Sequence, residues 1–309
     1  MSNKNLILAE ARQKAAEEWN KRQPKARLYT LLGIGSGIVA GIVSSLIMVH
    51  WFPFNFILLL VFPIIAYLSA RSYVRDNILY HPLEAVKILG KEPQDENDYW
   101  FRAEILSSYG FREAAVEDYR KALEIEPDEE LNEYIRLDLA ETLWELHRRD
   151  EALPIAEQLS TKEGHYQGLA LVLQGKILAE EDSAMALKCF DRAIEIEPKY
   201  FQHRLSKIRF FLDLNRLDEA AEVIEQTAKM LKWQGNYPAL YAEFYELGGE
   251  LALKRGRFAD AVREFTIAIR WCSSETKYYR SRSEAHDALG NLAKADADRR
   301  KADKLASKS

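Results

Sequence analysis

Apolar residues follow two different patterns along this chain, and each pattern predicts its own structure. Between residues 28 and 70 they form a nearly continuous run that contains no Lys, Arg, Asp or Glu. From residue 96 onward they instead recur every three or four positions among charged residues, which is the period of a helix with one buried face. We therefore predict an all-α protein with a membrane-inserted part followed by a second, charged helical part.

The uncharged run is 43 residues long, whereas a helix needs roughly 20 apolar residues to cross a bilayer. Pro53 interrupts the run, so we predict a transmembrane hairpin of two helices at residues 28–51 and 54–70. The second segment is short, and a shallow re-entrant hairpin is the alternative. A signal peptide is excluded because a second apolar segment follows the first at once.

Positive charges flank the hairpin on both outer sides. Seven Lys and Arg residues lie between positions 4 and 27, Arg71 and Arg75 follow the second span, and the turn between the spans has none. Because positively charged flanks stay on the cytoplasmic side, we expect two spans with both termini in the cytoplasm.

Three glycines in the first span, Gly33, Gly37 and Gly41, are spaced four residues apart and so share one face of the helix. Small residues at this spacing let another helix approach closely in lipid. One interpretation is that this face receives the second span. The other is that it docks a partner's transmembrane helix, or the same helix of a second copy in a homodimer.

The segments on either side of the hairpin have simpler interpretations. Residues 1–27 form a basic segment in which Leu8, Ala11, Ala15 and Trp19 recur at helical spacing. Such an amphipathic helix either lies on anionic membrane lipid or is an ordinary solvated helix. Residues 71–95 are expected to be a linker that includes some helix.

The region from residue 96 contains an internal repeat. Ala115, Tyr119, Ala122 and Pro127 are separated by 4, 3 and 5 positions, and Ala186, Phe190, Ala193 and Pro198 reproduce this spacing; Ala261, Phe265 and Ala268 repeat its first three members. The pattern resembles the tetratricopeptide repeat family, whose unit is a helix pair of about 34 residues. The resemblance implies an α-solenoid over residues 96–309 with about six helix pairs, which begin near residues 96, 133, 167, 201, 242 and 276.

The family pattern also assigns packing positions within each pair. The small residue of the first helix, helix A, matches Ala103, Ala140, Gly175 and Gly249, and the alanine of the second, helix B, matches Ala115, Ala152, Ala186, Ala220, Ala261 and Ala295. Tyr99, Tyr119, Phe190 and Phe265 are expected in the core. The third unit is one residue short, residues 230–241 extend the fourth, and Arg299 replaces the aromatic residue in the sixth, as suits a terminal cap.

In a stack of such pairs, the helices A line a groove that faces a partner. The residues that we expect to line this groove are Trp100, Glu104, Ser108, Leu137, Glu141, Trp144, Glu145, Val172, Lys176, Leu205, Arg209, Leu212, Glu243, Glu246, Glu250, Lys277, Arg280 and Glu284. Trp and Arg often anchor interfaces, which makes Trp100, Trp144 and Arg209 the preferred contacts. Alternatively, the tryptophans complete the core and the charges are only solvated.

Some members of the family hold the carboxyl-terminal tail of a chaperone with Lys and Asn at fixed positions of helix A. The matching positions in the first repeat of this chain are Trp100 and Glu104. The resemblance therefore does not extend to that clamp, and a heat-shock co-factor is disfavoured.

The charge of the repeat region indicates a protein partner. The whole chain has a formal charge of −5, and residues 96–309 have −9, because the N-terminal tail is basic. An acidic domain repels phosphate backbones, so we expect no nucleic-acid partner.

No pattern of catalytic or metal-binding residues stands out. Cys189 and Cys272 are far apart, each in a predicted helix B, and no CxxC, HExxH or phosphate-binding motif is present. We therefore expect no metal, no cofactor, no disulfide and no enzymatic activity, unless a partner chain supplies one.

These features predict a membrane-tethered scaffold for protein–protein interaction. The best motivated role is that of an assembly factor or accessory subunit of a multisubunit membrane complex, with peptide segments of membrane-associated proteins as partners. The alternative is a regulatory adaptor that delivers clients to a membrane protease or an envelope-biosynthesis enzyme. The layout is similar to that of anchored repeat proteins of the bacterial inner membrane and of photosynthetic membranes.

Overall fold

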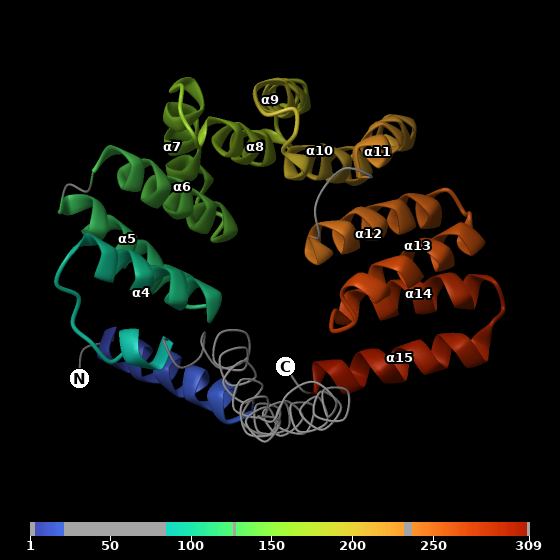
Figure 1. Ribbon diagram of the computed structural model, residues 1–309, viewed down its shortest axis with the longest axis horizontal. Coiled ribbons are helices and arrows are strands. Elements are labelled where there is room, and N and C mark those ends of the chain that lie inside the picture. The colour runs from blue at the N-terminus through green and yellow to red at the C-terminus, as the bar shows by residue number, and fades with distance from the viewer. Residues whose placement is uncertain (1–3, 22–84, 126–127, 232–236, 308–309) are drawn as a thin grey trace, which may run out of the picture. The chain divides into compact units, whose positions relative to one another are not determined.

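The computed structural model describes residues 4–21, 85–125, 128–231 and 237–307, and every regular element in these ranges is a helix (Figure 1). The predicted hairpin at 28–70, with Gly33, Gly37 and Gly41, lies outside the described residues. Within them, no helix combines the length and the apolar character that a membrane crossing requires. The chain divides into two compact units, one ending at Arg148 and the other beginning at Arg149.

The helices of the two units follow one another with short connections. The first unit contains a helix over residues 4–21, a short helix at 85–88, α4 (Glu96–Ser108), α5 (Arg112–Glu124) and α6 (Glu129–Glu145). The second unit contains α7 (Arg149–Thr161), α8 (Gln167–Leu178), α9 (Ser183–Ile196), α10 (Phe201–Asp213), α11 (Leu217–Leu231), α12 (Pro238–Lys254), α13 (Phe258–Trp271), α14 (Thr276–Ala288) and α15 (Leu292–Ala306).

Four of the six predicted starts of helix A are correct, since α4, α8, α10 and α14 begin at residues 96, 167, 201 and 276. The other two, α6 and α12, begin four residues earlier than expected. The Asp128 side chain accepts a hydrogen bond of 2.9 Å from the Leu131 N–H, which caps an additional turn of α6. Pro238 opens α12, where its fixed φ suits the first turn of a helix.

The predicted packing positions are confirmed. The six alanines of the helix B pattern are all fully buried, as are Ala103 and Ala140 in helix A. At Gly249 an added Cβ would lie 2.7 Å from Cε1 of Phe265, and at Gly175 it would lie 3.0 Å from Cζ of Phe190. The small residue is therefore required because the aromatic ring of the same helix pair presses against the backbone there.

The turn from helix A to helix B passes through the left-handed region in five of the six pairs. The residues concerned are Gly110, His147, Asn215, Gly256 and Gly290, with φ between 56° and 85°. In the fourth pair the Asn215 N–H donates to the Leu212 carbonyl and the Arg216 N–H to the Phe211 carbonyl, which is a Schellman motif. The third pair, which is one residue shorter, has no positive-φ residue in its described turn.

Two predictions about single residues were wrong. Tyr99 is half-buried, with the Arg102 guanidinium 5.5 Å from its ring. Cys272 caps the end of α13 and does not lie inside it. The cap residue Arg299 is half-exposed and pairs with Asp287 and Asp296, as a polar end of the array requires.

The amphipathic N-terminal helix follows neither of the two expected interpretations. Ala11 and Ala15 are fully buried, because the apolar stripe of residues 4–21 packs on the first repeat instead of facing lipid or water. The Lys4 ammonium lies 2.9 Å from the buried Asp118 carboxylate in α5. The Tyr109 hydroxyl donates to Glu18 at 2.7 Å. The helix is thus an integral part of the first unit.

Candidate protein-interaction surface

The predicted groove residues lie on the helices A, and these helices form a layer within the second unit. There, α8, α10, α12 and α14 contact one another in succession, and each contacts its own helix B (Figure 1). The groove residues of the first repeats, from Trp100 to Glu145, belong to the first unit. Each unit therefore presents its own set of candidate residues.

In the first unit, Trp100 contributes to a polar contact between helices. Its indole N–H donates to the Asp138 carboxylate of α6 at 3.0 Å, and its ring packs edge-on against Tyr134. Glu104 accepts a hydrogen bond of 2.5 Å from the buried Tyr119 hydroxyl. Both side chains thus connect neighbouring helices, and Trp100 is half-buried instead of projecting as a free anchor.

Asp138 is a member of this contact that the sequence did not reveal. Burial raises the pKa of its carboxyl group to about 7, and the negative charge of Glu104 adds to the increase. The hydrogen bond from Trp100 acts in the opposite direction because it favours the ionised form. Near neutral pH this site therefore exchanges a proton with water.

Four predicted groove residues belong to the core. Leu205 and Leu212 are fully buried, Val172 is 5% exposed and Leu137 is 8% exposed. Helix A packs against its own helix B and also against neighbouring repeats, so its buried face is wider than a single helical stripe. These apolar side chains cannot contact a partner, and their assignment to the groove was wrong.

The predicted charged residues of the second unit lie close together and pair with one another. Arg209 of α10 forms an ion pair with Glu250 of α12, and its guanidinium also lies 3.8 Å from Glu246. The Lys277 ammonium of α14 lies 2.7 Å from Glu246. We call Arg209, Glu246, Glu250 and Lys277 the ion-pair ladder.

The ladder changes the electrostatic interpretation of this surface. Arg209 and Lys277 neutralise Glu246 and Glu250 across three helices, so these residues do not form a patch of one sign. Glu246, Glu250 and Glu284 do line a cleft of about 380 Å³ between α12 and α14, together with Lys254 and Phe258. The structure thus joins three of the predicted acidic residues in one concave site.

The other predicted contacts remain on the surface to different degrees. Trp144 and Lys176 are half-buried, whereas Glu141, Arg280 and Glu284 are exposed. A half-buried tryptophan can lend part of its ring to a partner without leaving the fold. Partner binding at these residues stays a prediction.

Sequence reasoning also missed two equivalent ion pairs, one buried and one partly buried. The Arg102 guanidinium donates two hydrogen bonds to Asp118, and Arg282 does the same to Asp298. Each pair joins helix A to helix B of its repeat, at positions 180 residues apart in the first and sixth repeats. The sequence could have revealed these pairs, because the same Arg and Asp recur 180 residues later. The same offset also identifies the buried Ser283 as the small helix A residue of the sixth repeat.

Potential metal ligands and thiols are dispersed among the described residues. In the ranges that the structure covers, no group of three or more potential metal ligands comes together. Cys189 and Cys272 are both free, and burial raises the pKa of each thiol. Thiols with raised pKa values are poor nucleophiles near neutral pH.

Comparison with known proteins identifies one repeat directly. Residues 99–129, which cover most of α4 and α5, match the family model for the tetratricopeptide repeat. This segment is similar to a tetratricopeptide repeat. The helix pairs that follow share its buried alanines and its turns, so the described part of the chain from α4 onward is a series of tetratricopeptide-like helices.

Two curated relatives are organizing proteins from plants. The chain is 29% identical over 185 residues to Hsp70-Hsp90 organizing protein 1 of Glycine max, and 28% identical over 186 residues to the Hsp70-Hsp90 organizing protein of Triticum aestivum. In each case the match covers 58% of this chain and 30% of the relative. The chain thus spans under a third of the length of these relatives.

Two solved structures have a similar course of helices. PilW, a type IV pilus biogenesis factor, matches 66% of this chain and 90% of its own with a TM-score of 0.49 and 19% identity. A tetratricopeptide repeat protein from Parabacteroides merdae matches 67% of this chain and 78% of its own, with a TM-score of 0.46 and 17% identity.

Proposed function

We propose that this chain is a membrane-tethered scaffold for protein–protein interaction, acting as an assembly factor or accessory subunit of a multisubunit membrane complex. The tetratricopeptide helices supply the binding surface. The uncharged run at residues 28–70 supplies the tether. Tethering confines the search for partners to the membrane surface, which raises their effective concentration.

The docking of the N-terminal helix is the observation that best supports the proposed membrane tether. Residues 4–21 pack on α5 through Lys4 and Asp118, and the Lys14 ammonium lies 4.3 Å from the Phe111 ring. The described residues on either side of the uncharged run, 4–21 and 85–88, thus belong to one compact unit. A segment with both ends on one side of a bilayer crosses it an even number of times, and two crossings fit its length.

The flanking charges favour the cytoplasm as the side on which both ends lie, in a bacterial inner membrane or a related photosynthetic membrane. The topology is tested in a chain that carries Cys189→Ser and Cys272→Ser. Single cysteines are then introduced as Ser2→Cys, Asn55→Cys or Ser309→Cys, and intact cells are treated with a membrane-impermeant maleimide. We expect labelling of Asn55→Cys in intact cells, and labelling of the other two only after permeabilisation.

Labelling of either terminus in intact cells would contradict this topology, as would a full-length chain that stays soluble without detergent. A matched control replaces residues 28–70 by a flexible Gly/Ser linker of the same length. This variant keeps the helix at 4–21 attached to the first repeat, so a loss of membrane association then reports on the hairpin alone.

The alternative function, a regulatory adaptor that delivers clients, is favoured by the similarity to organizing proteins. The first repeat does not offer a cationic clamp, because the matching residues are Trp100 and Glu104. Trp100 is hydrogen-bonded to Asp138, and Glu104 is hydrogen-bonded to Tyr119. Affinity purification of the intact chain and of the linker variant separates the two functions. Membrane subunits that are lost with the hairpin support assembly, whereas soluble clients that both forms retain support delivery.

A further inference from the structure

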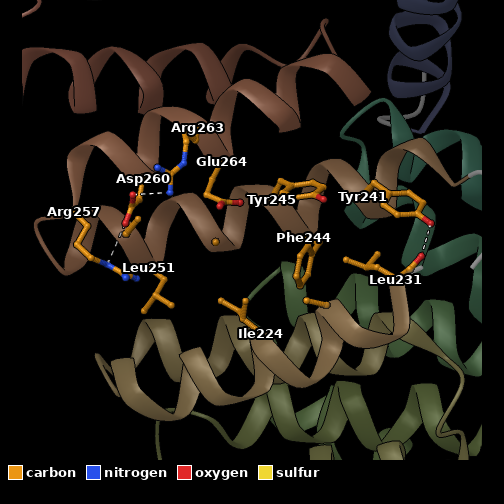
Figure 2. A pocket seen from close by; sticks show the side chains of 13 residues that line it. Ile224, Leu231, Tyr241, Phe244, Tyr245, Leu251, Arg257, Asp260, Arg263 and Glu264 are labelled. Carbon is orange, nitrogen blue, oxygen red and sulfur yellow. Dashed lines mark hydrogen bonds and ion pairs between the residues drawn. The ribbon is translucent and has the colours of Figure 1, made fainter. Parts of the chain in front are cut away.

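A second concave site lies behind the ion-pair ladder, on the other face of α12. A cleft of about 600 Å³ opens between α11, α12 and α13, all in the second unit (Figure 2). Its residues on α12 are Tyr241, Tyr245 and Gly248 together with their neighbours, whereas the ladder uses Glu246 and Glu250. Since the two sets lie on different faces of α12, both sites can be occupied at once.

The floor and one wall of this cleft are apolar. Ile224 and Leu231 of α11 face Phe244 of α12, whose ring points toward α11 in Figure 2. Tyr245 is half-buried on the opposite wall. A volume of about 600 Å³ lies within the range of sites that hold small ligands or a few side chains of a peptide.

The polar rim of the cleft contains one acid that lacks a partner. Arg263 and Arg257 both pair with Asp260, at 2.8 and 3.8 Å. Within the described part of the chain, the half-buried Glu264 carboxylate takes part in no hydrogen bond or ion pair. Burial raises the pKa of this carboxyl group, and the nearby charges of Arg263 and Arg257 offset only part of the increase.

Gly248 keeps the space in front of this carboxylate open. A Cβ at this position would lie 3.2 Å from the Glu264 Oε2 atom. The cleft thus combines an apolar floor with an unpaired negative charge at its edge. The group that complements this pair of features is an apolar segment that carries one cation.

We propose that this cleft binds a short apolar peptide segment of a protein partner, with one Lys or Arg of that segment paired to Glu264. The partner's apolar side chains cover the half-buried Ile224 and Tyr245, and its cation replaces the water that Glu264 loses on burial. The aromatic residues of the wall provide the contact area that anchors typically use. This site does not depend on the membrane tether, and so the two proposals can fail separately.

The test uses the full-length chain in detergent micelles and a display library of random 12-residue peptides. Peptides are selected on the unchanged chain and depleted on Gly248→Leu, whose side chain fills the cleft. We expect the selected peptides to combine apolar residues with Lys or Arg. Their affinity should fall at least tenfold in Glu264→Gln and be lost in Gly248→Leu.

Glu225→Gln serves as the matched control, because Glu225 is an exposed acid of α11 outside the cleft. It should leave the affinity unchanged, and Glu264→Lys should shift the selection toward acidic peptides. Circular dichroism verifies that each variant folds. Three outcomes would overturn the proposal: no peptide is selected, the selected peptides lack a basic residue, or the cleft belongs to a self-association surface, so that Gly248→Leu changes the oligomeric state.

Discussion

Asp138 is a single residue whose environment affects the stability of the first unit. Its pKa of about 7 lies well above the ordinary value of 3.8, since burial and the charges of Glu104 and Glu141 oppose ionisation. Between these two values the folded state holds a proton that the unfolded state has released. Stability therefore falls as the pH rises from about 4 to 7, and the full penalty remains above that range.

We predict that Asp138→Asn stabilises the protein at pH 8 by about 2 kcal/mol but has little effect at pH 4.5, since the amide can still accept the Trp100 hydrogen bond while avoiding the charge. The check is thermal unfolding of the detergent-solubilised chain at both pH values. Asp150→Asn, at an exposed position of α7, is the control. Equal stabilisation at both pH values would exclude the titration of Asp138 as the cause.

A second prediction at this scale concerns Gly168 in α8. A Cβ there would lie 2.4 Å from Oε2 of Glu197 and 2.7 Å from Nε2 of the buried His203, which are themselves 2.6 Å apart. Gly168→Ala should therefore destabilise the second unit by about 1–3 kcal/mol, because the new methyl group displaces a buried polar contact.

A double-mutant cycle checks this reason. If the clash with the carboxylate is the cause, Glu197→Ala should absorb much of the effect of Gly168→Ala, and the two destabilisations should not add. Additive values from thermal unfolding would show that Gly168 matters for another reason. The sequence alone could not identify this contact, because Gly168 lies outside the repeated pattern.

At the level of elements, the turns between helices A and B show where the sequence departs from the best local choice. Three of the five left-handed positions are glycine, but the second pair has His147 and the fourth has Asn215. Asparagine tolerates this conformation better than most residues, whereas histidine adopts it with backbone strain. The turn geometry is thus a property of the repeat, and His147 is its least favourable occupant.

We predict that His147→Gly stabilises the protein by about 1 kcal/mol, because the relief of backbone strain exceeds the added freedom of the unfolded chain. Ala179→Gly is the matched control, since Ala179 caps α8 with φ of −53° and should lose stability as glycine. Both are measured as changes in melting temperature. A loss of stability in His147→Gly would mean that the exposed imidazole makes a contact that outweighs the strain.

The buried positions of the helices could be predicted from the sequence, whereas the residues of the groove could be predicted only in part. Alanine and glycine at fixed spacing determine where two helices touch, so the buried positions followed directly from the residue pattern. Leu137 and Leu212 were assigned to the groove because a helical stripe does not reveal how wide the buried face becomes. Arg209 was taken as a free cation because its pairing with Glu250 depends on how α10 and α12 pack.

At the scale of the whole molecule, the uncharged run and the charged repeat region differ clearly in composition, whereas the attachment of residues 4–21 has no such signal. A basic amphipathic segment ahead of an apolar run suggests a lipid surface. Its partner is instead α5, which begins about a hundred residues later in the sequence. Contacts at such separation leave no periodic signal in a single sequence.

The attachment of the first helix to α5 determines how late in synthesis that helix can dock. Lys4 leaves the ribosome long before Asp118, since 114 positions separate them, and the apolar run lies between the two. The helix must therefore wait, undocked, until synthesis has passed the first repeat. If the run enters lipid as we propose, only a chain whose two flanks emerge on the same side can close the contact. Docking would thus act as a late checkpoint on insertion, and a wrongly threaded chain would be left with Ala11 and Ala15 uncovered.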